Sequence, residues 1–179
     1  FQLLLSRLSG QDDILVGTPM SGRNHVETES LIGFFVNTLV LRTDLGGNPT
    51  FAELLQRVRE TALGAYAHQE MPFEKLVEEL RPDRDLSRTP IFQVMFNMLN
   101  LSPVGEGEMG GLKVGDFYPM EYGAKFDLTL YVSEEQSRLS LGLLYNTDLF
   151  SKEHMTEMIR QYEYVLAQVT SNPAVRVDS

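Results

Sequence analysis

The spacing of hydrophobic and polar residues along the chain predicts a mixture of strands and helices. Alternation with a period of two is typical of strands that bury one face. Two strands are expected over the apolar segments 13–18 and 32–43, and three further segments show the alternation, at 91–100, 126–132 and 139–145. The last two are separated by a short polar link, so we expect them to form a β-hairpin.

Helical periodicity begins at positions that also carry N-terminal helix signals. The segment Thr50–Glu53 has the form of a capping box, in which each side chain accepts a hydrogen bond from the other residue's backbone N–H. Pro72 is expected at the first position of a second helix, and Ser151 at the N-cap of the last one. A further helix is expected over residues 1–8, ending near Gly10.

No repeat and no internal linker divides these elements, so we predict one α/β unit over residues 1–179, with a mixed β-sheet flanked by helices. A hydrophobic content of 42% is sufficient for a buried core. The net charge of −10 argues against nucleic acid and against an anionic membrane surface as partners. No cysteine is present, and no apolar run reaches the ~20 residues of a membrane span, so we expect a cytoplasmic protein.

Two sequence patterns resemble a dinucleotide-binding site and a metal site, but the residues around each of them argue against such a site. The segment Gly105–Gly110 matches the G-x-G-x-x-G pattern of dinucleotide-binding sites, but it does not join a strand to a helix. Glu106 and Glu108 would repel a pyrophosphate, so we interpret the segment as a loop. His154 and Glu157 are one helical turn apart, but a metal needs at least three ligands, and no metal site is predicted.

The polar segment before the third strand predicts a turn held by charge-assisted bonds. Asp85 and Ser87 can bond the local backbone, while Arg84 or Arg88 can pair with a carboxylate. The alternative is a loop in the wall of a substrate channel. His68 is expected at the end of the capped helix, where an imidazole can meet free carbonyl groups and the negative end of the helix dipole.

Asn37 and Thr38 place an amide and a hydroxyl inside the apolar segment 31–42. Burying such groups costs free energy unless they are hydrogen-bonded. We therefore expect them to serve either the structure or a functional site.

Three segments resemble sequence motifs of the condensation domains of nonribosomal peptide synthetases. They read Ile-Gly-Phe-Phe-Val-Asn-Thr-Leu-Val-Leu-Arg at 32–42, His-Gln-Glu-Met-Pro-Phe-Glu-Lys-Leu-Val at 68–77, and Arg-Asp-Leu-Ser-Arg-Thr-Pro-Ile-Phe-Gln-Val-Met-Phe at 84–96. In the second segment, Glu70 replaces the Asp that is usual in the family. The order and spacing also match, and shorter segments at 16–23, 125–128 and 145–150 agree. The resemblance thus covers nearly the whole chain.

The resemblance implies an enzyme of two chloramphenicol acetyltransferase-like subdomains with a channel between them. Donor and acceptor peptidyl carrier proteins would bring their phosphopantetheine arms into this channel, where an amine attacks a thioester and forms an amide. The family's His-His-x-x-x-Asp-Gly motif belongs to the N-terminal subdomain, and this chain contains no His-His pair. We therefore expect residues 1–179 to be an N-terminally truncated C-terminal subdomain, without a catalytic residue and without a directly bound cofactor.

Under this resemblance, Asn37 and Thr38 are the first candidates for residues of the substrate channel, and Arg23 and Gln93 follow them. A purely structural role for Asn37, bonding a neighbouring strand or turn, is the alternative. The segment Gly115–Lys125 is apolar but irregular, and it is the candidate for a crossover to the other subdomain.

Two other functions fit the same residues. One is a peptidyl epimerization domain of the same superfamily, which would invert a carrier-bound residue without any acceptor. The other is a noncatalytic module that only docks carrier proteins or a partner subunit.

Overall fold

The protein is described by a computed structural model that covers residues 1–83, 85, 87–99, 107–109, 112–114, 123–135 and 138–178. The strands are β1 (Asp13–Met20), β2 (Asn37–Asp44), β3 (Val94–Leu99), β4 (Gly107–Met109), β5 (Leu112–Val114), β6 (Leu128–Glu135) and β7 (Arg138–Tyr145). The helices are α1 (Gln2–Ser9), α2 (Val26–Glu29), α3 (Phe51–Ala67), α4 (Phe73–Leu80) and α5 (Lys152–Ser171).

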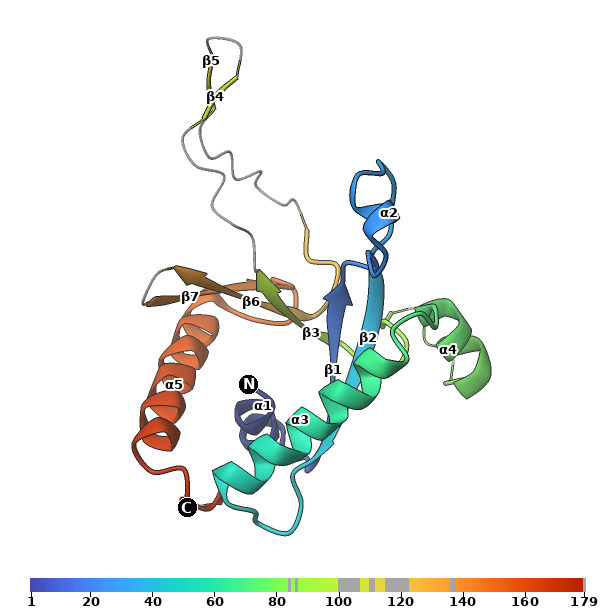
Figure 1. Ribbon diagram of the computed structural model, residues 1–179. Coiled ribbons are helices and arrows are strands. Elements are labelled where there is room, and N and C mark those ends of the chain that lie inside the picture. Colours follow the sequence, from blue (N-terminus) through green and yellow to red (C-terminus); the bar gives the residue numbers. More distant parts are fainter. Residues whose placement is uncertain are drawn as a thin grey trace.

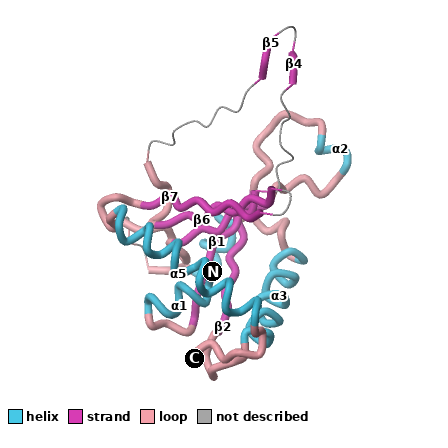
Figure 2. The backbone as a smooth tube through the Cα atoms, turned by 90° about the vertical axis from the view of Figure 1, so that its left-hand side faces the viewer, coloured by secondary structure: helices cyan, strands magenta, loops and turns pink. Residues whose placement is uncertain are grey.

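A mixed sheet with the strand order β2-β1-β3-β6-β7 carries the fold, while β4 and β5 pair with each other separately. Strand β1 is antiparallel to β2, β6 is antiparallel to β7, and β3 is parallel to both of its neighbours. Helices α1, α3 and α5 lie on one face of the sheet, with α1 between the other two (Figure 1). Figure 2 shows the same layering from the side. The predicted α/β architecture and the β6–β7 hairpin are confirmed.

The core consists of two apolar clusters that meet at α1. Leu3 belongs to the first cluster, which gathers residues of β1, α3 and the C-terminal part of α5. Leu4 belongs to the second, which gathers β6 and the N-terminal half of α5. The buried members of the second cluster are Leu4, Leu128, Leu130, Val132, Met155, Met158 and Tyr162. Adjacent positions of one short helix therefore join the two parts of the core.

The central junction of the sheet is narrow, because among the described residues β1 and β3 pair at Gly17 and Met95 alone. A glycine is required there. A β-carbon at position 17 would lie 2.3 Å from the ring of Phe92, which is one of the most buried side chains in the described part of the chain. The Phe92 ring also packs edge-on against Phe73 of α4, at 5.6 Å between ring centroids.

The local helix signals are largely confirmed. The Thr50 hydroxyl accepts from the backbone N–H of Glu53 at 3.3 Å, and the Glu53 carboxylate accepts from the Thr50 N–H at 2.8 Å. Ser151 caps α5 by accepting from His154 N, and Gly10 ends α1 in the left-handed conformation. Pro72 is the N-cap of α4 and not its first residue, which is a shift of one position.

The strand boundaries differ more from the prediction. Strand β1 runs on through Pro19, which pairs with Thr38 of β2. Strand β2 begins at Asn37 and not at residue 32. Strand β3 begins at Val94, because Ile91 has a φ of 73° and cannot continue an extended strand.

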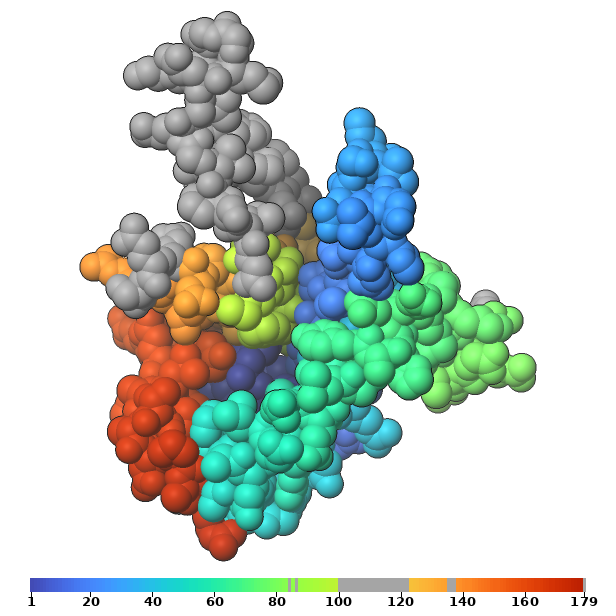
Figure 3. All heavy atoms as spheres, viewed as in Figure 1, coloured from blue at the N-terminus to red at the C-terminus, as the bar shows by residue number. Residues whose placement is uncertain are grey.

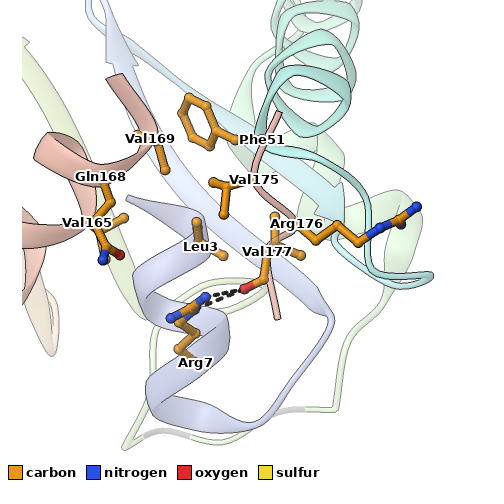
Figure 4. A pocket seen from close by; sticks show the side chains of 9 residues that line it. All are labelled: Leu3, Arg7, Phe51, Val165, Gln168, Val169, Val175, Arg176 and Val177. Carbon is orange, nitrogen blue, oxygen red and sulfur yellow. Dashed lines mark hydrogen bonds between the residues drawn. The ribbon is translucent and has the colours of Figure 1, made fainter. Parts of the chain in front are cut away.

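The C-terminal residues 172–178 bind across the first turn of α3. The carbonyls of Pro173 and Val175 accept from Ala52 N and Phe51 N, each at 2.9 Å, so they satisfy two N–H groups that a helix start leaves free. The Arg7 guanidinium donates to the carbonyl of Val177 (Figure 4). A cavity of about 20 Å³ beneath this contact is lined mainly by aliphatic side chains and is too small for a substrate.

Removing the α3 cap tests how far this local signal contributes to the fold. Thr50→Ala should lower the free energy of unfolding by about 1 kcal/mol, because Glu53 N loses its acceptor. Thr156→Ala is the control, since within the described residues this exposed hydroxyl in α5 bonds only to Lys152 O of its own helix. Urea denaturation measures both. Equal losses for the two variants would contradict the capping role.

Thr43 offers a test in the opposite direction. Its side chain is buried, and its hydroxyl has no hydrogen-bond partner in the described part of the chain. Thr43→Val keeps the shape and removes the unsatisfied group, so it should stabilise the protein by about 1 kcal/mol. Thr43→Ala removes the methyl group as well and should be less stable than Thr43→Val by a comparable amount, about 1 kcal/mol. A denaturation midpoint for Thr43→Val below that of the parent chain would show that the hydroxyl is satisfied.

Candidate functional site

Asn37 starts β2 on the face that carries the helices, opposite Met20 of β1. Its Nδ2 donates to the carbonyls of Gln69 and Met71, each at 2.8 Å. Its Oδ1 accepts from Phe73 N at 3.2 Å and also from the next backbone N–H of β2. Two donors and two acceptor positions are thus all used, which fully satisfies this half-buried amide. These bonds tie β2 to the connector between α3 and α4.

Thr38 lies on the other face of the sheet, because successive residues of a strand point to opposite sides. It pairs with Pro19 in the β1–β2 ladder. The two first channel candidates are therefore neighbours in sequence with side chains on different faces. Contact of either with a substrate stays a prediction.

Arg23 lies in the loop 21–36, which connects β1 to β2 and contains α2. Its guanidinium carbon is 4.2 Å from the centroid of the Phe35 ring. The same guanidinium donates to the carbonyl of Thr28, and its Nη1 is 3.5 Å from the carbonyl of Glu29. These contacts hold Arg23 against its own loop.

Gln93 lies nearer the start of β1 than the other three candidates. It lies two residues before Met95, the residue that pairs with Gly17, whereas Asn37 pairs at the far end of β1. Its Nε2 donates to the carbonyl of Thr89 at 3.0 Å, and it lines a cleft of about 400 Å³. Asn37, Thr38 and Arg23 do not line this cleft.

The cleft lies where β1 and β3 separate, between α1, the start of α5 and the first residues of β6. Its wall is mostly apolar and includes Leu5, Leu8, Phe92, Phe150, Met155 and Met158. Asp127 and His154 add polar groups. The sequence analysis missed this cleft, because it is formed by segments more than a hundred residues apart.

The predicted turn before β3 is held by Asp85. The Oδ1 atom of Asp85 accepts from Ser87 N at 2.9 Å and from the Ser87 hydroxyl at 2.6 Å. These hydrogen bonds, and more weakly the nearby Arg88, lower the pKa of the Asp85 carboxyl. Arg88 Nε lies 3.6 Å from Asp85 Oδ2, in an exposed ion pair. Arg84 lies outside the described residues.

His68 is the C-cap of α3, at the negative end of the helix dipole as expected. Its backbone N–H donates to the carbonyl of Ala65 at 3.1 Å. The imidazole is exposed and has no hydrogen-bond partner in the part of the chain that the structure describes, so the expected bond to a free carbonyl is not formed there.

Among the residues described, no three or more His, Asp and Glu side chains gather in a way that could hold a metal ion. In the same residues, no helix combines the length and the apolar composition that crossing a membrane would require. The crossover candidate Gly115–Lys125 lies outside the described residues up to position 122.

A mixed five-stranded sheet with its helices packed on one face is the architecture of the chloramphenicol acetyltransferase-like α/β class. Within that class, the model of the condensation-domain family matches residues 1–179. The chain therefore belongs to the condensation-domain family, which its relatives place in nonribosomal peptide synthetases.

Two curated relatives illustrate the range of similar proteins. Tyrocidine synthase 3 of Brevibacillus parabrevis is 41% identical over 177 residues, which are 99% of this chain and 3% of the relative. Malpinin synthetase of Mortierella alpina is 50% identical over 167 residues, which are 93% of this chain and 2% of the relative. The chain thus spans only a few per cent of the proteins that it resembles.

Two solved structures share the fold closely. The four-domain nonribosomal peptide synthetase AB3403, bound to AMP and glycine, aligns with a TM-score of 0.89 and 27% identity over 99% of this chain and 14% of that one. The X-domain from teicoplanin biosynthesis aligns with a TM-score of 0.86 and 27% identity over 98% of this chain and 41% of that one.

The amide of Asn37 provides the sharpest test of the site's construction. Asn37→Ala removes the partners of two carbonyls and of Phe73 N, and it should cost about 1–3 kcal/mol of unfolding free energy. Asn37→Asp keeps the acceptor but sets a carboxylate oxygen against the carbonyls of Gln69 and Met71, so its loss should be at least as large as that of Asn37→Ala.

Hydrogen exchange locates the effect of this change. In Asn37→Ala the amide of Phe73 should exchange faster relative to that of Leu54, whose bond to Thr50 O lies at the other end of α3. Thr38→Ser should leave both amides unchanged. Unaltered exchange at Phe73 in Asn37→Ala would contradict the tie between β2 and the α3–α4 connector.

Proposed function

We propose that residues 1–179 form the C-terminal subdomain of a condensation domain that joins carrier-bound aminoacyl or peptidyl groups. The observation that carries this proposal is the family match along the whole chain. The alignment with about two fifths of the solved X-domain chain supports a subdomain and not a complete enzyme.

In the proposed reaction, the amine of the acceptor attacks the carbonyl carbon of the donor thioester. A C–N bond forms, the C–S bond breaks, and the proton lost by the amine ends on the departing phosphopantetheine thiol. Handling this proton belongs to the other subdomain in the proposal. The absence of a His-His pair from residues 1–179 supports this.

The proposed partners are the N-terminal subdomain and the donor and acceptor peptidyl carrier proteins, whose phosphopantetheine arms supply the thioesters. The chain binds no cofactor of its own in this scheme. The loop 21–36 supports a covering partner, because Ile32 and Phe34 are 104% and 90% exposed. Clustered apolar exposure of this kind marks interaction surfaces. The cytoplasmic location expected from the sequence remains a prediction.

Reconstitution tests the proposal. The chain is combined with the N-terminal subdomain encoded beside it, and loaded donor and acceptor carrier proteins are added. Mass spectrometry of the acceptor carrier should show the condensed thioester only when both subdomains are present. Ile32→Asp should weaken association of the two subdomains by about tenfold or more, since it places a charge in the covered surface. Leu63→Asp is the control, because Leu63 is an exposed apolar residue of α3 and not of the loop 21–36.

Each other result would overturn the proposal in a defined way. Inversion of a carrier-bound residue without an acceptor would identify an epimerization domain. Carrier binding without product, from a pair that associates and folds, would identify a docking module. Product from the chain alone would show that it holds the proton-handling group itself.

A further inference from the structure

The loop 21–36 packs onto one of its own side chains, that of Phe35. Across this loop, which the structure describes throughout, the half-buried residues are Gly22, Arg23, Thr28 and Phe35, and the others are exposed. Figure 3 shows the loop, in lighter blue, standing out from the body of the molecule. A projecting loop that buries a few of its own residues has an internal structure that its surroundings do not impose.

Arg23 is the residue that joins the two sides of the loop. Its guanidinium carbon lies over the Phe35 ring, 4.2 Å from the ring centroid. Its N–H groups reach in the other direction to the carbonyls of Thr28 and Glu29, at the end of α2. Only a planar guanidinium combines stacking on a ring with in-plane donation, so lysine cannot replace it fully.

Two glycines permit this close packing. A β-carbon at Gly22 would lie 1.8 Å from the carbonyl oxygen of Phe35, and Gly22 has a φ of 65°. A β-carbon at Gly33 would lie 3.0 Å from the Phe35 ring. Any larger residue at position 22 would push the two sides of the loop apart.

The residues next to this packed centre point outward. Ile32 and Phe34 are almost fully exposed, and Val26 of α2 is 78% exposed. We call these three residues the apolar tip. The Arg23–Phe35 contact therefore fixes the backbone on which the apolar tip is mounted, without covering the tip itself.

We propose that Arg23 is a positioning residue: acting through Phe35, it holds the apolar tip in the arrangement that packs against the N-terminal subdomain. This inference rests on the proposed function. It replaces the assignment of Arg23 to the substrate channel, because the guanidinium is already engaged by the ring and by two carbonyls. A loop ordered before association loses less conformational entropy when it docks.

Hydrogen exchange of the chain alone tests the positioning role. The amides of Thr28 and Leu31 are the reporters, since they bond to His25 O at 2.9 Å and to Thr28 O at 3.3 Å. Arg23→Ala and Phe35→Leu should each speed their exchange about three- to tenfold, and the double variant should add little more. Arg23→Lys should fall close to Arg23→Ala.

Phe34→Ala is the matched control, because it removes the neighbouring aromatic ring from the tip and not from the packed centre. It should leave both reporter amides unchanged. Unaltered exchange in Arg23→Ala, or equal acceleration by Phe34→Ala, would overturn the proposal whether or not the chain takes part in condensation. Circular dichroism checks that each variant is folded. If Arg23→Ala does not fold, the exchange rates of the Thr28 and Leu31 amides in Phe35→Leu test the proposal instead.

The second arm uses the reconstituted pair of subdomains. Arg23→Ala and Phe34→Ala should both raise, about threefold or more, the concentration of N-terminal subdomain needed for half-maximal rate. With the partner saturating, kcat and the acceptor KM of Arg23→Ala should stay within about twofold of the parent. A large loss of kcat at saturating partner would instead show that Arg23 contacts the reacting groups. If the parent pair forms no product, that result counts against the proposed function alone. The hydrogen-exchange experiment uses the chain without its partner, so its outcome does not depend on product formation.

Discussion

The contact between Gly17 and the Phe92 ring is the constraint on which the arrangement of the molecule depends. It lies where β1 pairs with β3, at the one pair of residues that joins them in the described part of the chain. This pairing connects the antiparallel strands β1 and β2 to the β3-β6-β7 half of the sheet. Because the two strands touch at one point, they separate on one side and open the cleft that Gln93 lines. The other end of β1 leads into the loop 21–36 and to Asn37.

Burial of apolar side chains, and not ion pairing, stabilises this arrangement. Each fully buried aliphatic side chain contributes about 1.5–3 kcal/mol, and α1 places Leu3 and Leu4 into both clusters of the core. The bidentate pair between Arg42 and Asp13, at 2.8 Å, has side chains that are 70% and 50% exposed. Exposed pairs of this kind contribute little, because water and salt screen them.

Two of the polar residues in the segments that resemble family motifs make structural contacts within the chain. All donors and acceptors of the Asn37 amide bind the α3–α4 connector or the next residue of its own strand. The guanidinium of Arg23 contacts the Phe35 ring and the Thr28 carbonyl of its own loop. Both hold segments at the end of β1 from which apolar residues project. Under the inference proposed for Arg23, a motif residue matters for the reaction by shaping the surface that the N-terminal subdomain covers.

The sequence alone determined the features that depend on neighbours within a few residues. The capping box at Thr50, the Ser151 cap, the turn at Asp85 and the β6–β7 hairpin follow from local hydrogen bonds and periodicity. Tertiary structure alone decided where β2 begins, which face Asn37 takes and what it binds. It also decided that Ile32 and Phe34 leave the strand pattern for a projecting loop. Those outcomes depend on contacts between distant segments, such as Gly22 with Phe35 or β1 with β3, and periodicity carries no information about which distant segments meet.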